Sequence, residues 1–296
     1  MGDKMIDFIC TLKDITEIDK FAKLGVFGLI INDPKYSTYV PKYNGISVIK
    51  ETIEKVHAHN MKLFVRCDAL FYENELDQLS LYLKKLIELK VDGIYFADMA
   101  VYQLTKQYGS LDRLIYDPET TITNSDDLST YLQLKIARCV IAKELTYDKI
   151  FELIQSNTDG SEMIGFGYLR MSRSRRLMLS GYQRAFLDES LHDRSDIQAQ
   201  EASRSERFYI NEDDHGTYTY SPYVFWCIKE LKKLSGYLKT MRLERGFIDD
   251  ELYFMMIDIY QKAIMEEDVY RLEKTIKDAY PNINFSTGFL YEKTTL

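Results

Sequence analysis

The chain has 296 residues, of which 46% are hydrophobic and 28% charged. This composition excludes an intrinsically disordered protein, and the length suffices for one large domain with a full core. The formal net charge of -8 at pH 7 excludes non-specific duplex binding over the whole surface, so contact with nucleic acid requires a local patch.

The N-terminus and the cysteines indicate the compartment. Asp7 interrupts the N-terminal segment before an apolar core of signal-peptide length forms, and no apolar run approaches the roughly 18 residues that cross a bilayer. We therefore expect a cytoplasmic protein without membrane contact. The four cysteines form no CxxC pair, so we expect reduced thiols in the core rather than a zinc site or a redox pair.

Eight short apolar runs, rich in Ile, Val, Phe and Tyr, alternate with amphipathic segments. They lie at 6–10, 26–32, 62–67, 93–98, 112–116, 138–143, 162–168 and 237–243. Such runs are typical of strands in a parallel sheet that is buried on both faces. The intervening patterns predict helices. One begins after the capping box at 14–17, another begins near 126, and the others lie at 48–60, 75–90, 146–156, 249–264 and 267–279.

This alternation predicts an α/β fold, a TIM-like (β/α)8 barrel, formed by residues 1–296 as a single domain. The alternative is an open doubly wound sheet, but no GxGxxG fingerprint follows the first strand. The alternation fails between 169 and 222, which is too long for an ordinary barrel loop. Within this insertion after strand seven, residues 207–220 predict a β-hairpin with its turn at 214–216.

The segment 167–184, GYLRMSRSRRLMLSGYQR, concentrates arginine in an acidic chain. It leaves the C-terminal end of strand seven, the barrel face that carries active sites. Because a guanidinium group binds phosphate and carboxylate bidentately, we expect contact with an anion or RNA. The candidates are Arg170, Arg175 and Arg176. In the alternative, these arginines form salt bridges with acids such as Asp188, Glu189 and Glu201.

Polar side chains also follow several predicted strands. The candidates for ligand binding at the barrel mouth are Asp68, Asp98, Glu119, Thr120, Glu144 and Glu244. If the carboxylates converge, repulsion raises some of their pKa values or recruits a cation, unless the arginines neutralise them. Helix caps and ordinary ion pairs are the alternative interpretation. A turn and a cap explain residues 124–127 without any ligand.

No catalytic motif is present. The sequence contains no HExxH, and no Ser-His-Asp or Cys-His arrangement can be identified. His57 and His59 are two residues apart on a predicted helix and do not share a face, so we expect no metal site. The loop 33–45 interleaves lysines with tyrosines, a pattern that can stack unpaired bases but that arises by chance in a tyrosine-rich chain.

Six segments, in their order and spacing, resemble the collagenase-like peptidases, peptidase family 32 of unknown catalytic type. They are LFVRCDALFYENEL (63–76), VDGIYFADMAV (91–101), ETTITN (119–124), AKEL (142–145), EDDHGTY (212–218) and FSTGFL (285–290). The resemblance covers nearly the whole chain and implies a barrel. It also implies either a peptidase without an agreed nucleophile or a role in hydroxylation, such as prephenate-dependent 5-hydroxylation of the wobble uridine of tRNA.

The chain departs from the hydroxylation-type members, which bind an iron–sulfur cluster through four cysteines. Arg170 and Leu177 stand where two of these cysteines would fall, and no cysteine lies between 140 and 226. Because thiolates hold such clusters, we expect no cluster and no other cofactor in this chain. The resemblance therefore implies a short, cluster-free partner subunit in tRNA wobble-uridine 5-hydroxylation, working with a longer, cluster-bearing paralogue and tRNA. A peptidase and a non-catalytic scaffold are the alternatives.

Overall fold

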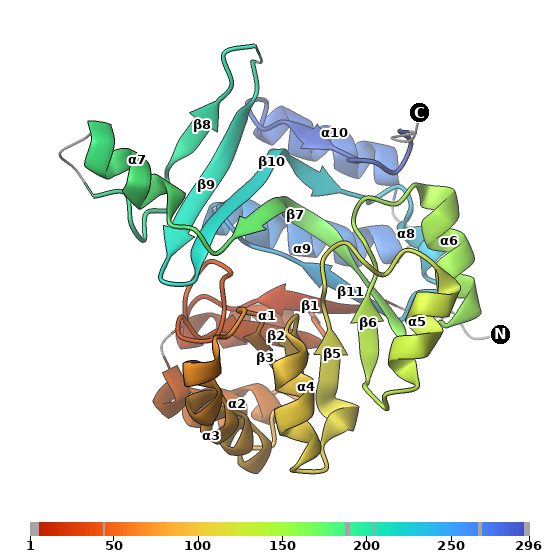
Figure 1. The fold of residues 1–296 in the computed structure, drawn as a ribbon. Coiled ribbons are helices and arrows are strands. Elements are labelled where there is room, and N and C mark those ends of the chain that lie inside the picture. The colour runs from red at the N-terminus through yellow and green to blue at the C-terminus, as the bar shows by residue number, and fades with distance from the viewer. Residues whose placement is uncertain (1–5, 44, 187–189, 204, 266–267, 293–296) are drawn as a thin grey trace.

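The computed structural model describes residues 6–43, 45–186, 190–203, 205–265 and 268–292, and its centre is a closed barrel of eight parallel strands (Figure 1). Each strand pairs with the next, and β11 closes the ring by pairing with both β7 and β1. The barrel strands are β1 (Asp7–Thr11), β2 (Gly28–Asn32), β3 (Lys62–Cys67), β4 (Gly93–Phe96), β5 (Leu114–Tyr116), β6 (Arg138–Val140), β7 (Ser161–Ser174) and β11 (Thr240–Leu243). The predicted (β/α)8 barrel is confirmed, and the open doubly wound sheet is wrong.

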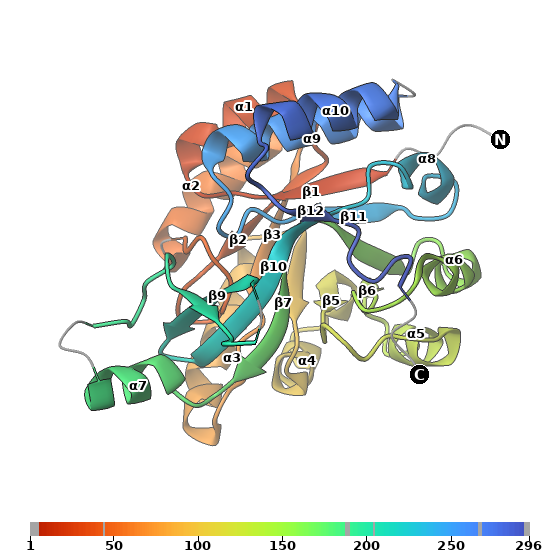
Figure 2. The ribbon, with the colours of Figure 1, turned by 90° about the horizontal axis from the view of Figure 1, so that it is seen from above.

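Helices surround the barrel, as the view from above shows (Figure 2). They are α1 (Ile18–Lys23), α2 (Gly45–Ala58), α3 (Leu76–Glu88), α4 (Met99–Lys106), α5 (Ser125–Leu132), α6 (Tyr147–Ser156), α8 (Leu231–Leu234), α9 (Asp250–Ile264) and α10 (Val269–Ala279), with 3-10 turns at Ile15–Glu17, Glu73–Glu75 and Leu111–Arg113. The predicted helices are confirmed, including the capping box of Asp14 and Glu17. The short helix α4 was not predicted. Within the described ranges, no helix has the length and apolar character needed to cross a membrane.

The strands bury both of their faces, which explains their continuous apolar runs. The outward faces pack against the helices in one large apolar cluster. The inward face forms a second cluster from Ile9, Ile30, Phe64, Tyr95, Ile115 and Val140, one residue from each of β1 to β6. Gly28 and Gly93 make room for Phe64, because a Cβ at either position would stand 2.7 Å from its ring. All four cysteines are free and buried, as expected.

The insertion continues the barrel sheet. Beyond the barrel, β7 pairs antiparallel with β10 (Gly216–Trp226), which pairs with β9 (Arg207–Asp213), and β8 (Gln198–Gln200) adds to β9. The predicted hairpin is therefore confirmed, and β12 (Phe285–Ser286) pairs with β10 near the chain's end. The helix α7 (Met178–Phe186), which was not predicted, projects from the end of β7, away from the barrel (Figure 1).

Candidate functional site

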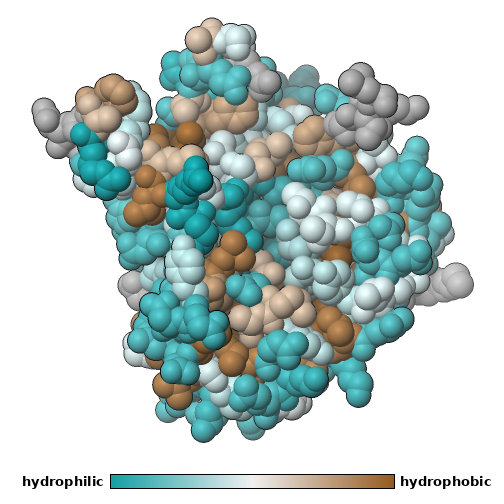
Figure 3. Space-filling view, viewed as in Figure 1, coloured by the Kyte–Doolittle hydropathy of each residue, from teal (hydrophilic) through white to brown (hydrophobic). Residues whose placement is uncertain are grey.

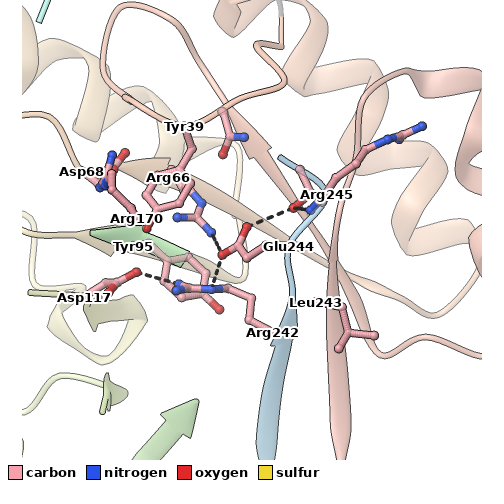
Figure 4. A network of polar contacts seen from close by, with 12 residues as sticks. Tyr39, Arg66, Asp68, Tyr95, Asp117, Arg170, Arg242, Leu243, Glu244 and Arg245 are labelled. Atoms are coloured by element: carbon pink, nitrogen blue, oxygen red, sulfur yellow. Dashed lines mark hydrogen bonds and ion pairs between the residues drawn. The ribbon is translucent and has the colours of Figure 1, made fainter. Parts of the chain in front are cut away.

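The barrel interior holds a network of buried, paired charges (Figure 4). On β11, Arg242 lies 2.8 Å from Asp117 Oδ2 and 2.7 Å from Glu244 Oε1. On β3, Arg66 forms a second ion pair with Glu244, whose side chain is 6% exposed. Nearer the start of the strands, Arg138 Nε lies 2.6 Å from Glu162 Oε2. Strands β3, β6, β7 and β11 thus each place a charged side chain in the barrel.

At the barrel mouth, the network is completed by Arg170 on β7. Its Nη1 donates to Thr38 Oγ1 at 2.6 Å, and its Nη2 lies 3.2 Å from Asp68 Oδ2 and pairs with Glu119. Lys143, which follows β6, lies 3.5 Å from the other carboxylate oxygen of Glu119. Loops after β2, β3 and β5 therefore meet at one guanidinium group, and the loop after β6 joins them through Glu119. Barrel geometry brings such loops together at the C-terminal ends of the strands.

Tyr39, from the loop between β2 and α2, covers these charges. Its ring lies 4.0 Å from the guanidinium carbon of Arg170 and 3.7 Å from that of Arg66. Tyr39 is only 5% exposed, so the two arginines are shielded from solvent by an aromatic face that also attracts cations. The tyrosines of this loop are buried, and Tyr36 stacks on Tyr82 at 3.8 Å, so in this conformation they do not offer free faces to bases.

The acids of the mouth are ionised at neutral pH. Burial raises the pKa of Glu119, but the charges of Arg170 and Lys143 outweigh it and lower the pKa to about 2. The pKa of Asp68 is likewise held below its usual range, because Arg170 and Arg66 outweigh the effect of burial. Arg66 and Arg242 do the same for Glu244. The arginines thus neutralise the acids, and none of these three carboxyl groups has the raised pKa of a general acid.

Two features of the mouth are typical of binding sites. Glu119 adopts φ 72°, a left-handed conformation that is rare outside glycine, and its two ion pairs hold it there. Several buried polar atoms also have no hydrogen-bond partner within the described part of the chain. They are Nε and Nη1 of Arg66, Nε of Arg170, and the hydroxyl groups of Tyr39 and Tyr220. Such atoms retain the capacity to bind a polar group.

The structure separates three predicted site residues from this network. Asp98 is the N-cap of α4, where Oδ1 accepts from Ala100 N at 2.9 Å and Oδ2 accepts from Phe71 N at 3.0 Å. This is the capping role that the alternative interpretation assigned to it. Thr120 and Glu144 are exposed, and within the described ranges neither side chain forms an ion pair or a hydrogen bond. Of the six candidates, Asp68, Glu119 and Glu244 are brought into the network.

The candidate arginines also differ from one another. Arg170 is 2% exposed and pairs with Asp68 and Glu119 at the mouth. Arg175 donates to the carbonyl oxygen of Leu70 and lies 3.8 Å from the ring of Tyr72. Arg176 is exposed, and in the part of the chain that the structure describes its guanidinium group has no partner. Two of the acids proposed as alternative partners, Asp188 and Glu189, lie outside the described residues.

Sequence reasoning missed Arg66, Arg242 and Asp117, and it considered Tyr39 only as one of the loop tyrosines that could stack a base. The two arginines could have been found from the sequence, because KLFVRC and YLKTMRL each place an arginine inside a strand that is otherwise largely apolar. A charge in a strand buried on both faces must find a partner, since an unpaired buried charge is strongly destabilising. Nothing in the sequence indicated that Tyr39 would cover the mouth.

A groove follows the junction of the barrel with the insertion. It comprises one cavity of about 690 Å³ and another of about 390 Å³, which share Tyr209 and Phe247. The two rings stack at 4.5 Å with an interplanar angle of 4°. Two lysines at its edge are paired: Lys13 lies 3.1 Å from Asp250, and Lys42 lies 2.6 Å from Asp213. Arg207, which also lines it, forms no ion pair with the described residues, and the acids Asp193, Asp196 and Asp249 line it as well. The groove is therefore aromatic and roughly charge-balanced rather than basic.

Comparison with known proteins identifies relatives along nearly the whole chain. Residues 13–295 match the model of peptidase family U32. Over 306 residues the chain is 24% identical to tRNA hydroxylation protein P2 of Bacillus subtilis, covering 98% of this chain and 99% of that protein. Over 265 residues it is 25% identical to the uncharacterized protease MJ0090 of Methanocaldococcus jannaschii, covering 81% of this chain and 62% of that protein.

A third relative is tRNA hydroxylation protein P of Haemophilus influenzae, which is 24% identical over 162 residues and covers 53% of this chain and 35% of that protein. Among solved structures, the U32 peptidase Mk0906 superposes with a TM-score of 0.52 at 11% identity, covering 82% of this chain and 94% of that one. This likeness supports the barrel fold alone. The family match spans all but the first residues and the last one, and it confirms the resemblance seen in the sequence. The chain belongs to peptidase family U32.

Proposed function

We propose that this protein is a partner subunit in the 5-hydroxylation of the wobble uridine of tRNA. The observation that carries the proposal is the end-to-end match with tRNA hydroxylation protein P2, which covers 98% of this chain and 99% of that protein. Because the whole of one chain aligns with the whole of the other, the similarity concerns the entire protein rather than a shared barrel module.

The chemistry of the barrel mouth supports a binding subunit over a peptidase. Its acids Asp68, Glu119 and Glu244 are ionised and held by arginines, so none is a ready proton donor to a leaving group. The unused hydrogen-bonding atoms of Arg66, Arg170 and Tyr39 would instead hold a polar ligand in place. In this role Arg170 positions Glu119 and Asp68 through its ion pairs, and Arg176 is the one of the three candidate arginines that is exposed to meet an anionic group of a partner.

The expected iron–sulfur chemistry belongs to the longer paralogue. The four cysteines of this chain come from β1, β3, β6 and the end of β10, and burial raises their pKa values, to about 12 for Cys139. Such thiols do not fit a cluster, which requires converging thiolates. Within the described ranges, no group of three or more His, Cys, Asp or Glu side chains is placed to hold a metal ion. The lack of a cluster stays a prediction.

Mass spectrometry of tRNA nucleosides tests the proposal directly. Cells that lack the gene should lose 5-hydroxyuridine-type wobble nucleosides, and a plasmid copy of the gene should restore them. If redundancy is excluded by also deleting any longer paralogue, an unchanged profile contradicts the proposal. Cleavage of gelatin by the purified chain, together with an unchanged nucleoside profile, would favour the peptidase alternative.

A further inference from the structure

The helix α7 exposes an apolar surface that nothing in the described chain covers. None of its residues is buried. Its large apolar side chains, with that of the preceding residue, are 41% exposed at Leu177, 49% at Met178, 54% at Tyr182 and 72% at Phe186. The rings of Tyr182 and Phe186 contact each other at 5.1 Å, so they form one patch rather than two isolated side chains. Figure 3 shows apolar side chains on this projecting part of the molecule, with hydrophilic ones between them.

This helix is nevertheless held firmly at its N-terminal end. The Glu212 carboxylate on β9 accepts hydrogen bonds from Leu179 N at 2.6 Å and from Ser180 N at 2.8 Å, and Thr217 Oγ1 accepts from Met178 N at 2.9 Å. Burial raises the pKa of Glu212, but the hydrogen bonds from Ser180 and Thr217 outweigh it, so Glu212 stays charged. A buried carboxylate thus caps α7 and fixes its direction, which presents the apolar patch in a preorganised form.

The charges beside the apolar patch limit which kind of molecule can cover it. Arg176 and Arg184 are exposed beside the patch, and their guanidinium groups have no partner among the residues described, whose nearest gap is 187–189. A second copy of this chain that paired α7 with α7 would bring these arginines together, which is unfavourable. Phosphates of RNA do not cover aliphatic side chains such as Leu177. Lipid surfaces attract helices rich in cations, whereas α7 itself carries one arginine in a chain of net charge -8.

We propose that α7 docks into an apolar groove of another protein whose rim is acidic. The groove receives Leu177, Met178, Tyr182 and Phe186, and carboxylates on its rim pair with Arg176 and Arg184. This is the helix-in-groove mode of recognition, in which few large side chains supply most of the affinity. The partner's identity rests on the proposed function, which makes it the longer, cluster-bearing member of the same family from the same cell.

The test uses the full-length chain and that purified longer family member as the probe. The double variant Tyr182→Ser/Phe186→Ser removes two anchors and keeps a similar helix propensity. The control is Tyr270→Ser on α10, where the side chain is 73% exposed and equally aromatic. Isothermal titration calorimetry should show binding weakened at least about tenfold in the double variant and unchanged in the control. Both variants should keep the thermal midpoint of the wild type, because none of the substituted side chains is buried.

The charge-reversal variant Arg176→Glu/Arg184→Glu should also weaken binding, and the difference from wild type should shrink as salt is added. Unchanged affinity in the double variant overturns the docking proposal, as does a wild-type chain that does not bind the longer protein. Two further results would assign the patch to another occupant. One is self-association of the wild type in sedimentation velocity that the double variant loses, and the other is binding to vesicles of anionic lipid that the double variant loses. If deletion of the gene still abolishes the modified nucleoside in any of these cases, the proposed function stands while the docking surface fails.

Discussion

Arg170 on β7 holds Asp68 and Glu119 together. Its Nη2 lies 3.2 Å from Asp68 Oδ2 and also pairs with Oε1 of Glu119. It occupies a position at which the longer, cluster-bearing relatives are expected to have a cysteine. A guanidinium group there cannot ligate iron, but it joins the loops that follow β3 and β5. In this chain Arg170 is therefore part of the structure of the barrel mouth.

We expect Arg170→Ala to lower the free energy of unfolding by about 3–5 kcal/mol, because it leaves two buried carboxylates without their main partner. Arg170→Met, which fills the same space without the charge, should be destabilising as well, since the acids remain. Urea denaturation followed by circular dichroism measures both. Arg176→Ala, at an exposed position whose side chain has no partner among the described residues, is the matched control and should change stability by less than about 0.5 kcal/mol. A loss in Arg170→Ala no larger than in this control would contradict the assignment.

Stability should fall as the pH drops below about 4.5. The pKa of Glu119 is 4.5 in an unfolded chain and about 2 in the folded protein, so the unfolded state takes up the proton first. The stabilisation is complete above pH 4.5, amounts to about 3 kcal/mol, and is lost as the pH falls towards 2. Urea denaturation at a series of pH values measures this slope. Glu119→Gln should flatten the slope over the same range, and an equal slope in both proteins would exclude this residue as the cause.

The sequence predicted the scaffold better than the site, for a physical reason. Apolar runs such as 62–67 identify strands because burial on both faces requires them, and Asp14 and Asn124 identify helix starts because their side chains cap exposed amides. The register of the strands and the closure of the barrel decide which polar side chains meet. The local pattern of residues in the sequence encodes neither. Asp98 therefore had the same local signature as Asp68, yet one caps a helix and the other binds Arg170. The sequence likewise did not indicate that α7 projects from the molecule, since an amphipathic helix normally packs against its own core.

The chain purified without oxygen should contain no iron–sulfur cluster, even after treatment with iron, sulfide and reductant. Its thiols are buried and burial raises their pKa values, so they are not available as converging thiolates. Iron and acid-labile sulfide analysis, with the charge-transfer absorption of a cluster, provide the measurement. A longer, cluster-bearing relative treated in parallel is the control that the reconstitution works. Iron and sulfide in stoichiometric amounts that resist gel filtration would refute this prediction.

Gly167 on β7 lies against Glu244, the residue that follows β11, and we expect it to tolerate no side chain. Its φ of +121° is rarely adopted by other residues, and a Cβ would stand 2.6 Å from the backbone oxygen of Glu244. Gly167→Ala should therefore destabilise the protein by more than about 1 kcal/mol and disturb the ion pairs of Glu244 with Arg66 and Arg242. Gly236→Ala is the control, because no atom lies within 4 Å of its added Cβ and its φ is not positive. Thermal unfolding compares the two variants, and equal midpoints would show that the backbone at 167 relaxes without cost.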